Sequence, residues 1–282
     1  GAKIKIKNGY ILAEAKNGLI GATINFPTIS VGATENAILA AVQASGKTVL
    51  KNCAIEPEIG DLVVYLKKLG SKIKIIKRTI YISGSDKIFT VNHNVILDRI
   101  ELGTYLIAGA VCAKKLTFSN VNPKLIKTEI SVLKKMGVKI EIKKNKISIF
   151  ETKNLKKINI QTKPYPGFPT DLQAQMMILM SKATGISKIQ ENIFENRFMH
   201  IPELRRMGAK IKVENNIASI TGPTNLSGAE VMATDLRASV CLVLAGLVSE
   251  NRTIINRIYH LDRGYQDLEK KLKKCKAEIK RI

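Results

Sequence analysis

The ten residues LRRMGAKIKV, at positions 204–213, decide the fold because close variants of them occur three more times. The variants are LKKLGSKIKI at 66–75, LKKMGVKIEI at 133–142 and LKKCKAEIKR at 272–281, so the four copies begin at intervals of 67, 71 and 68 residues. A repeat of this length indicates a structural unit that is copied along the chain. In each copy a pair of basic residues is typical of a helix end, and the alternating residues that follow predict a strand.

An apolar helix is predicted upstream of each copy, and each such helix begins near an acidic residue. These acids are Glu35, Glu101, Asp171 and Asp235. A short β-like segment, such as TVLKN at 48–52 or TIINR at 253–257, separates this helix from the basic one. The unit therefore has the order βαβαββ, which indicates an α/β fold. Glycine follows the second helix in three copies, where a left-handed C-cap is expected, and Lys276 departs from this pattern.

The composition is that of a folded protein with a strong positive charge. The chain has 282 residues, of which 45% are hydrophobic, and a formal net charge of +23. Basic pairs at the helix ends account for part of this charge, and there they complement the helix dipole and face water. Because no set of stacking aromatic residues accompanies the charge, nucleic acid is not expected as a partner.

Several other classes of protein are disfavoured by features that the sequence lacks. No apolar run reaches the roughly 18 residues that a membrane span requires, and no secretion signal opens the chain, so we expect a cytoplasmic protein without a membrane partner. The four cysteines and three histidines form no close pairs. Neither a zinc site nor a disulfide framework is therefore predicted. Cys112 and Cys241 fall inside apolar helices and are expected to be buried.

The first residues look like the end of a repeat rather than its beginning. The segment GAKIKIKNGYIL at 1–12 matches GAKIKVENNIAS at 208–219, but without the two helices that should precede it. The chain also has no initiator Met. These features predict a truncated chain that starts inside a repeat.

Three longer stretches are specific enough to indicate a family. They are PYPGFPTDLQAQ at 164–175, ENIFENRFMHIPELRRMGA at 191–209, and VMATDLRASVCLVLAGL at 231–247 with RIYHLDRGYQDLEKKL at 257–272. Together they closely resemble the UDP-N-acetylglucosamine 1-carboxyvinyltransferase family, enolpyruvyl transferases of the EPSP synthase-like superfamily. The resemblance runs through essentially the whole chain and is strongest from Pro164 onward.

The resemblance implies a fold of six βαβαββ units, three in each of two domains that form inside-out α/β barrels. Four of the six units would be present. Residues 1–97 would form a partial first domain, with one closing strand and one repeat unit. Residues 98–282 would form a second domain of three repeat units that lacks its N-terminal first strand. An open sheet edge of this kind favours pairing with another chain, and a separate N-terminal fragment is one partner that it would accept.

The family's reaction transfers the enolpyruvyl group of phosphoenolpyruvate to the 3-hydroxyl of UDP-N-acetylglucosamine and releases phosphate, the first committed step of peptidoglycan synthesis, without a metal or other cofactor. A sugar hydroxyl needs a base, and developing anionic charge needs cations. The resemblance implies that Asp171 is the general base and that Arg237 and Arg263 are catalytic arginines. From the residues alone, Asp171 has an alternative role at its helix start, because Thr170 and Gln173 fit a capping box.

The same resemblance implies the substrate contacts. Arg197 would line the cleft, and Asp235 would cap its helix and hold a neighbouring arginine. The turn at 28–32 would present backbone N–H groups to a diphosphate. The residues expected to contact the nucleotide sugar there and at the uracil end are Thr28, Ile29, Ser30, Val31, Gly32, Ile193 and Phe194.

Some positions depart from the family pattern or have two interpretations. Thr28 stands where the family usually has a basic residue, and Tyr165 stands where a histidine is common. Glu56, Glu58 and Arg99 match an interdomain network in the family, and ordinary surface pairing is the alternative.

The general acid is the main gap in the expected site. In the family the residue that protonates phosphoenolpyruvate, commonly a cysteine, lies on a loop of the first domain, and no cysteine of this sequence lies in that motif. We therefore predict that the isolated chain does not turn over. Two alternative functions stay open: a catalytically inert protein that binds a nucleotide sugar or another chain, and an enolpyruvyl transferase for shikimate 3-phosphate.

Overall fold

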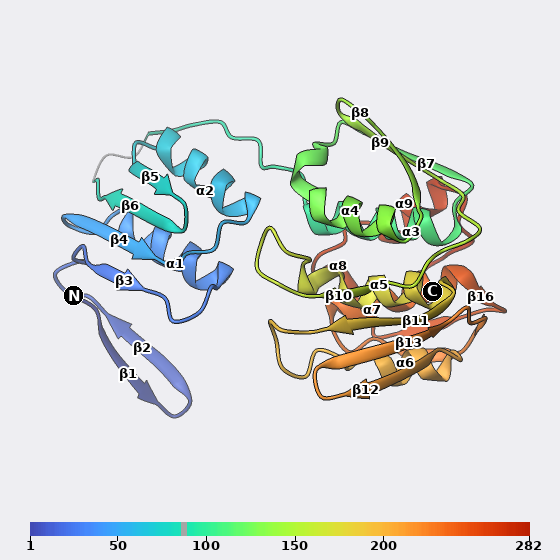
Figure 1. The fold of residues 1–282 in the computed structure, drawn as a ribbon. Helices are drawn as coiled ribbons and strands as arrows, with labels where there is room; N and C mark the ends of the chain where they lie inside the picture. Colours follow the sequence, from blue (N-terminus) through green and yellow to red (C-terminus); the bar gives the residue numbers. More distant parts are fainter. Residues whose placement is uncertain (86–88) are drawn as a thin grey trace. The chain divides into compact units, whose positions relative to one another are not determined.

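The computed structural model describes residues 1–85 and 89–282, and the chain forms two compact lobes of mixed helices and strands (Figure 1). Lobe 1 comprises Gly1–Ile96 together with Pro164–Pro166, and lobe 2 comprises Leu97–Lys163 and Gly167–Ile282. The prediction of an α/β fold is confirmed. No helix in the described part of the chain combines the length and the apolar character that a bilayer span requires.

Lobe 1 contains a β-hairpin and one sheet that is covered by two helices. Its elements are β1 (Lys3–Lys7), β2 (Tyr10–Glu14), β3 (Thr23–Asn25), α1 (Val31–Ala41), β4 (Lys47–Lys51), α2 (Pro57–Lys68), β5 (Lys72–Ile76) and β6 (Thr79–Ser83). The sheet has the order β3-β4-β6-β5, in which β3 and β4 are parallel and the other pairs are antiparallel. Buried apolar residues of both helices and of the sheet, including Ile38, Leu50 and Ile80, form its core.

Lobe 2 begins with one helical layer and one antiparallel sheet. These elements are α3 (Arg99–Cys112), β7 (Lys115–Ser119), the 3-10 helix η1 (Pro123–Ile126), α4 (Lys127–Lys135), β8 (Lys139–Lys143) and β9 (Lys146–Phe150). The sheet order is β7-β9-β8. A second sheet follows, with the same order of parallel and antiparallel pairs as in lobe 1. Its elements are β10 (Asn159–Gln161), the 3-10 helix η2 (Thr170–Leu172), α5 (Gln173–Lys182), β11 (Gly185–Gln190), α6 (Ile201–Arg206), β12 (Lys210–Glu214) and β13 (Ile217–Gly222).

The last part of lobe 2 has shorter strands. Its elements are β14 (Leu226–Ser227), β15 (Glu230–Met232), α7 (Leu236–Val248), β16 (Ser249–Glu250), β17 (Ile254–Asn256), α8 (Tyr259–Asp262) and α9 (Leu268–Lys274). Strand β17 pairs with β15 only, among the described residues, whereas β4 and β11 each have an antiparallel neighbour as well.

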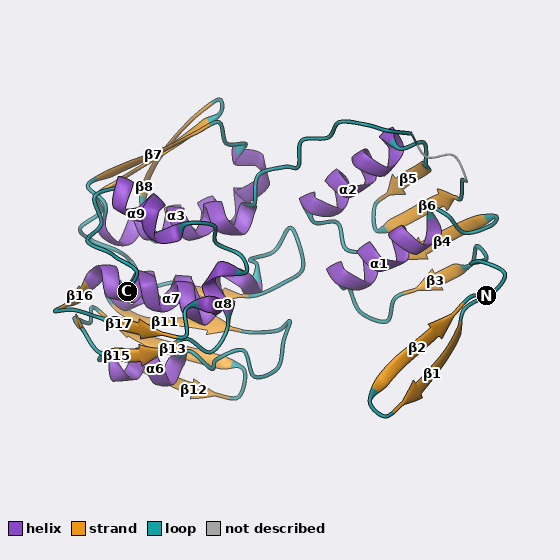
Figure 2. Ribbon diagram, turned by 180° about the vertical axis from the view of Figure 1, so that it is seen from behind, coloured by secondary structure: helices purple, strands orange, loops and turns teal. Residues whose placement is uncertain are grey.

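Helices α3, α5 and α7 form the core of lobe 2 and pack against one another. Figures 1 and 2 show them between the β7–β9–β8 sheet and the strands β10 to β13. A helix that is apolar on all sides is stable only when it is surrounded by protein, and the burial of every residue from Gln173 to Ser181 in α5 meets that condition. Side chains near the starts of the three helices contact one another, as described below, so the helices begin at the same end of the lobe. That end carries the candidate site.

The second helix of each repeat ends as the sequence predicts. The paired basic residues at 67–68, 134–135, 205–206 and 273–274 are all exposed. Gly70, Gly137 and Gly208 have positive φ angles of 109°, 91° and 91°. Lys276 takes the same conformation, with φ of 69°, although a side chain makes it less favourable.

One prediction about the cysteines is wrong. Cys241 is buried in α7, as expected, and burial raises the pKa of its thiol. Cys112 is exposed, because it is the last residue of α3 rather than an interior one.

Candidate active site

Asp171 lies at the start of α5, but its carboxylate does not cap the helix. Pro169 occupies the N-cap position of the short η2 turn, and no side chain accepts a hydrogen bond from the backbone N–H groups at the start of this turn. The capping box predicted from Thr170 and Gln173 is therefore wrong. The Thr170 hydroxyl instead donates to Glu191 at 2.8 Å.

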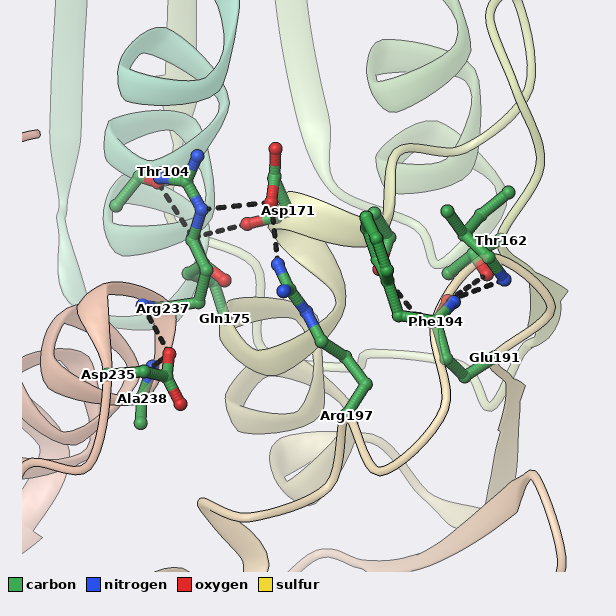
Figure 3. A network of polar contacts seen from close by, with 12 residues as sticks. Thr104, Thr162, Asp171, Gln175, Glu191, Phe194, Arg197, Asp235, Arg237 and Ala238 are labelled. Carbon is green, nitrogen blue, oxygen red and sulfur yellow. Dashed lines mark hydrogen bonds and ion pairs between the residues drawn. The ribbon is translucent and has the colours of Figure 1, made fainter. Parts of the chain in front are cut away.

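Two arginines hold the Asp171 carboxylate on one of its oxygens (Figure 3). Arg197 donates from Nη2 to Oδ1 at 2.7 Å, and Nε of Arg237 lies 3.1 Å from the same atom. No described residue contacts Oδ2, and 36% of the Asp171 side chain is exposed. The carboxylate is thus compensated in charge and oriented, while one oxygen stays open to a ligand.

Arg237 is placed by the capped N-terminus of α7. Asp235 is the N-cap residue, and its Oδ1 accepts from the backbone N–H groups of Arg237 at 2.8 Å and Ala238 at 3.0 Å. Burial opposes the charge of the Arg237 guanidinium, but attraction to Asp171 and hydrogen bonds to Asp171 and Tyr265 outweigh it and raise the pKa of Arg237. Arg237 therefore stays charged, as ligand binding would need. The carboxylate of Asp235 contacts the backbone of Arg237, not an arginine side chain.

Glu191 is a buried carboxylate that joins three segments around the site. It follows β11 and accepts from the hydroxyls of Thr162 at 2.9 Å and Thr170 at 2.8 Å. It also accepts from the backbone N–H groups of Ile193 at 2.9 Å and Phe194 at 3.2 Å. One carboxylate thereby fixes both the turn that carries Asp171 and the loop that carries the two predicted nucleotide contacts.

That loop borders a surface depression of about 860 Å³, large enough for a ligand of substrate size. The residues from Glu191 to Met199 line it, with Val213, Asn215 and Asn216. Phe194 is 54% exposed, and the guanidinium of Arg197 lies 5.1 Å from the centre of its ring. An exposed ring beside a cation suits an aromatic base next to an anionic group.

His200 is buried, with Nε2 3.3 Å from the sulfur of Met177. Burial lowers the pKa of this histidine to about 4; Asp235 acts to raise it, and Arg197 to lower it. The imidazole is therefore neutral at pH 7.

Arg263 is not part of this ion-pair cluster. It is exposed at the end of α8 and makes no hydrogen bond or ion pair with the residues that the structure describes. Its neighbour Gly264 packs against Leu236, the first residue of α7, so closely that a Cβ atom at Gly264 would lie 2.8 Å from that side chain. The backbone of Arg263 is thus held beside the helix start that carries Arg237.

The predicted phosphate turn at 28–32 lies in lobe 1, at the start of α1. Ser30 is the N-cap residue, and its hydroxyl accepts from the backbone N–H of Ala33 at 3.2 Å. No acid lies in the first turn, and a Cβ atom at Gly32 would meet nothing within 4 Å, so the backbone there is open to a ligand. Thr28 is exposed, whereas Ile29 and Val31 pack against the core of the lobe.

The three residues assigned to an interdomain network have the following surroundings within their own lobes. Within lobe 1, Glu56 accepts from the backbone N–H of Tyr165 at 3.2 Å. Glu58 lies in the first turn of α2. The pKa of Glu35 is raised, mainly by burial and then by the negative charges of Glu58 and Glu56. Within lobe 2, Arg99 pairs with Glu129 at 3.8 Å.

Comparison with known proteins identifies the family to which this arrangement belongs. The family described as EPSP synthase (3-phosphoshikimate 1-carboxyvinyltransferase) matches residues 1–272. The chain belongs to this family. It is 59% identical to the UDP-N-acetylglucosamine 1-carboxyvinyltransferase of Pelagibacter ubique and 52% identical to that of Endomicrobium trichonymphae, over its whole length and 68% of each relative. The structure of the enolpyruvyl transferase NikO from Streptomyces tendae matches 99% of this chain and 69% of that chain, with a TM-score of 0.92 at 27% identity.

For this member of the EPSP synthase family, sequence reasoning missed the buried polar residues that support the site. Glu191 carried one signal, since an acid directly after a buried strand is unusual. Thr104 and Gln175 carried another, because each interrupts an otherwise apolar helix. Tyr265 lies two residues after Arg263, in a motif of which only the arginine was predicted to be functional. The structure shows that Tyr265 is 1% exposed and packs in the core.

Proposed function

We propose that this protein is a UDP-N-acetylglucosamine 1-carboxyvinyltransferase, which transfers the enolpyruvyl group of phosphoenolpyruvate to the 3-hydroxyl of UDP-N-acetylglucosamine and releases phosphate in peptidoglycan synthesis. The observation that carries the proposal is the Asp171 carboxylate, which is bound on Oδ1 by Arg197 and Arg237 and is open on Oδ2. The names of the two relatives with 59% and 52% identity support the choice of acceptor.

In the proposed reaction Asp171 acts as the general base. The hydroxyl proton moves to Oδ2 while the hydroxyl oxygen forms a bond to C2 of phosphoenolpyruvate, and C3 of the enol gains a proton from a general acid that is not among the residues assigned here. The adduct then returns a proton from C3 to that acid as the bond between C2 and the phosphate oxygen breaks, which restores the double bond and releases phosphate. Base catalysis of this kind is worth about 10²- to 10⁴-fold in rate.

The arginines have the complementary task of balancing anionic charge. Guanidinium groups bind phosphate and carboxylate oxygens in a forked geometry, and a partly buried site strengthens such contacts. We assign Arg237 and Arg263 to the phosphate and carboxylate of phosphoenolpyruvate, and Arg197 to the nucleotide sugar. The exposed ring of Phe194 and the neighbouring Ile193 would contact the uracil or the sugar.

Lobe 1 contributes a second phosphate-binding element to the proposal. The N-terminus of α1 has free backbone N–H groups, no acid in its first turn and open space at Gly32, which together suit a diphosphate. The turn from Thr28 to Gly32 is therefore assigned to the nucleotide diphosphate.

Calorimetry on the chain tests the choice of ligand. We expect heat of binding with UDP-N-acetylglucosamine and none with shikimate 3-phosphate. Binding of shikimate 3-phosphate alone would overturn the proposed acceptor, and binding of neither would overturn the proposed function.

Phosphate release from phosphoenolpyruvate tests the chemistry. Because the isolated chain is predicted not to turn over, release by this chain would contradict that prediction; any release that does occur should require UDP-N-acetylglucosamine and fall about 100-fold or more in Asp171→Asn. The matched control is Asp98→Asn, because Asp98 caps α3 through the N–H groups of Ile100 and Glu101 and lies outside the site. Release at the same rate in Asp171→Asn and in the parent chain would overturn the assignment of Asp171 as the general base.

A further inference from the structure

Three buried polar side chains meet beneath Arg237, and the proposed reaction gives them no role. They are Thr104 of α3, Gln175 of α5 and Tyr265 of the segment between α8 and α9, which are 1%, 0% and 1% exposed. The hydroxyls of Thr104 and Tyr265 are 2.8 Å apart, and Gln175 donates from Nε2 to the Thr104 hydroxyl at 3.1 Å. Burying three polar groups in an apolar core is unfavourable unless they bond to one another, so their presence here needs a reason.

This buried trio contacts both members of the ion pair. Arg237 donates from Nη1 to the Tyr265 hydroxyl at 3.5 Å, while Nε of the same guanidinium lies 3.1 Å from Oδ1 of Asp171. Gln175 also donates to the backbone carbonyl of Asp171 at 3.0 Å. Figure 3 shows the side chains of Thr104, Gln175 and Arg237 close to Asp171.

The guanidinium fixes one direction in this network. It can only donate, so the Tyr265 oxygen accepts from Arg237. Either hydroxyl of Thr104 and Tyr265 can donate to the other, and the Thr104 oxygen accepts from Gln175. Burial raises the pKa of Tyr265, although Arg237 acts against this shift, and the phenol keeps its proton at neutral pH.

We propose that Tyr265 is a positioning residue for Arg237: its hydroxyl sets the rotation of the guanidinium so that Nε stays on Asp171 and Nη2 is presented to an anionic group of the substrate. Because a guanidinium is planar, contacts at Nε and Nη1 fix its plane. No described residue contacts Nη2. The inference rests on the proposed function for the identity of the substrate, but the orientation of Arg237 is a property of the free protein.

The chain offers a matched control in Tyr105, next to Thr104. Its hydroxyl is also buried, but it has no hydrogen-bond partner among the described residues. Tyr105 and Tyr265 pack in the same apolar cluster. Removal of either hydroxyl therefore has a similar effect on packing, and only one of the two removals affects Arg237.

The first experiment measures the hydrogen exchange of the Arg237 Nε–H by NMR in the chain without ligand, with the signal assigned by its loss in Arg237→Lys. We expect Tyr265→Phe and Thr104→Val each to speed this exchange about fivefold or more, since each removes a link that holds the guanidinium. Tyr105→Phe should leave it unchanged. Unchanged exchange in a folded Tyr265→Phe chain would overturn the proposal, and Thr104→Val repeats the test if the phenylalanine variant does not fold.

The second experiment measures ligand affinity by calorimetry. Tyr265→Phe should weaken the binding of phosphoenolpyruvate to the chain saturated with UDP-N-acetylglucosamine by about tenfold, because a poorly oriented Arg237 loses a charged hydrogen bond. The affinity for UDP-N-acetylglucosamine itself, and both affinities in Tyr105→Phe, should not change. Equal weakening of both ligands would indicate a general structural effect and contradict the proposal. If the proposed function is wrong, the unaltered chain binds neither ligand, and the exchange experiment still decides the role of Tyr265.

Discussion

Asp171 and Asp235 occupy the same place in two neighbouring repeats, yet their carboxylates have different partners. Asp235 accepts two hydrogen bonds from the backbone of its own helix, at Arg237 and Ala238. Asp171 caps nothing and is held by two arginine side chains that come from outside its helix. An acid at a helix start is favourable in both cases, so position alone does not distinguish a stabilising acid from a functional one.

The difference shows what frees Asp171 from a structural role. Pro169 opens the η2 turn without a side-chain cap, and Thr170 is bound by Glu191. The expected capping residues are thus occupied elsewhere. We infer that Asp235 contributes mainly to stability and Asp171 mainly to function, and each prediction below tests one side of this comparison.

His200 provides the largest expected effect, because it lies close enough to sense the charges of both Asp235 and Arg197. Its pKa is about 4 in the folded chain against an ordinary value of 6.5. The unfolded chain therefore binds the proton first as the pH falls, so the stability that depends on neutral His200 is complete above pH 6.5 and is lost between pH 6.5 and 4. The loss amounts to about 3 kcal/mol in the free energy of unfolding.

Urea unfolding at a series of pH values measures this loss, with His200→Gln as the comparison. The variant should show a shallower fall between pH 6.5 and 4, whatever its stability at pH 7. NMR titration of His200 sharpens the comparison, because Asp235→Asn should lower its pKa and Arg197→Ala should raise it. Identical pH profiles for the variant and the parent chain would show that His200 does not titrate in this way.

Asp235→Ala gives the second effect. The substitution leaves two N–H groups at the start of α7 without their acceptor, so we expect a loss of about 1 to 2 kcal/mol in the free energy of unfolding. Asp235→Ser should recover most of it, because serine is also a good N-cap residue. Thermal and urea unfolding measure both variants, and equal losses for alanine and serine would argue against capping.

Arg197→Ala tests the functional side. Its guanidinium contacts Asp171 and lies beside the ring of Phe194, so the substitution should weaken the binding of UDP-N-acetylglucosamine by about tenfold through the loss of a charged contact. Arg197→Lys, which keeps the charge and loses the fork, should fall between. Calorimetry gives both values, and unchanged affinity in the alanine variant would remove Arg197 from the nucleotide site.

The structure around these two helices shows which features can be predicted from the sequence. The buried inner helices and the exposed basic pairs follow from periodicity and were predicted correctly, but the strand predicted after the fourth copy is wrong, because residues 275–282 form no strand. The left-handed conformation after the helix was predicted from the glycine found there in three copies. Lys276 has the same conformation in the fourth copy, although it is not glycine. These features depend on the conformational preferences of residues that are close together in the sequence.

The partners of the site residues were harder to predict, because they come from distant segments. The capping box at Thr170 is a local pattern that Glu191, 21 residues further along, overrides with a hydrogen bond. Tyr265 contacts Thr104 across 161 residues of sequence, and no local pattern indicates such a pair. The placement of Arg237 and Asp171 in one site was expected only from the family resemblance. The spacing of residues along the chain does not show which distant residues come together.

The smallest expected effect is the most direct test of the comparison, because Asp171→Asn should change the free energy of unfolding by no more than about 0.5 kcal/mol. The Asp171, Arg197 and Arg237 side chains are 36%, 28% and 20% exposed, so solvent screens both ion pairs, and Arg237 keeps its hydrogen bond to Tyr265 when they are broken. Salt up to 0.5 M should reduce even this difference, whereas the loss in Asp235→Ala should persist, because it comes from short hydrogen bonds to the backbone. Urea unfolding at low and high salt compares the two variants. A loss at Asp171 as large as that at Asp235 would mean that the arginines hold the fold together through this carboxylate, and the division between a stabilising and a functional acid would fail.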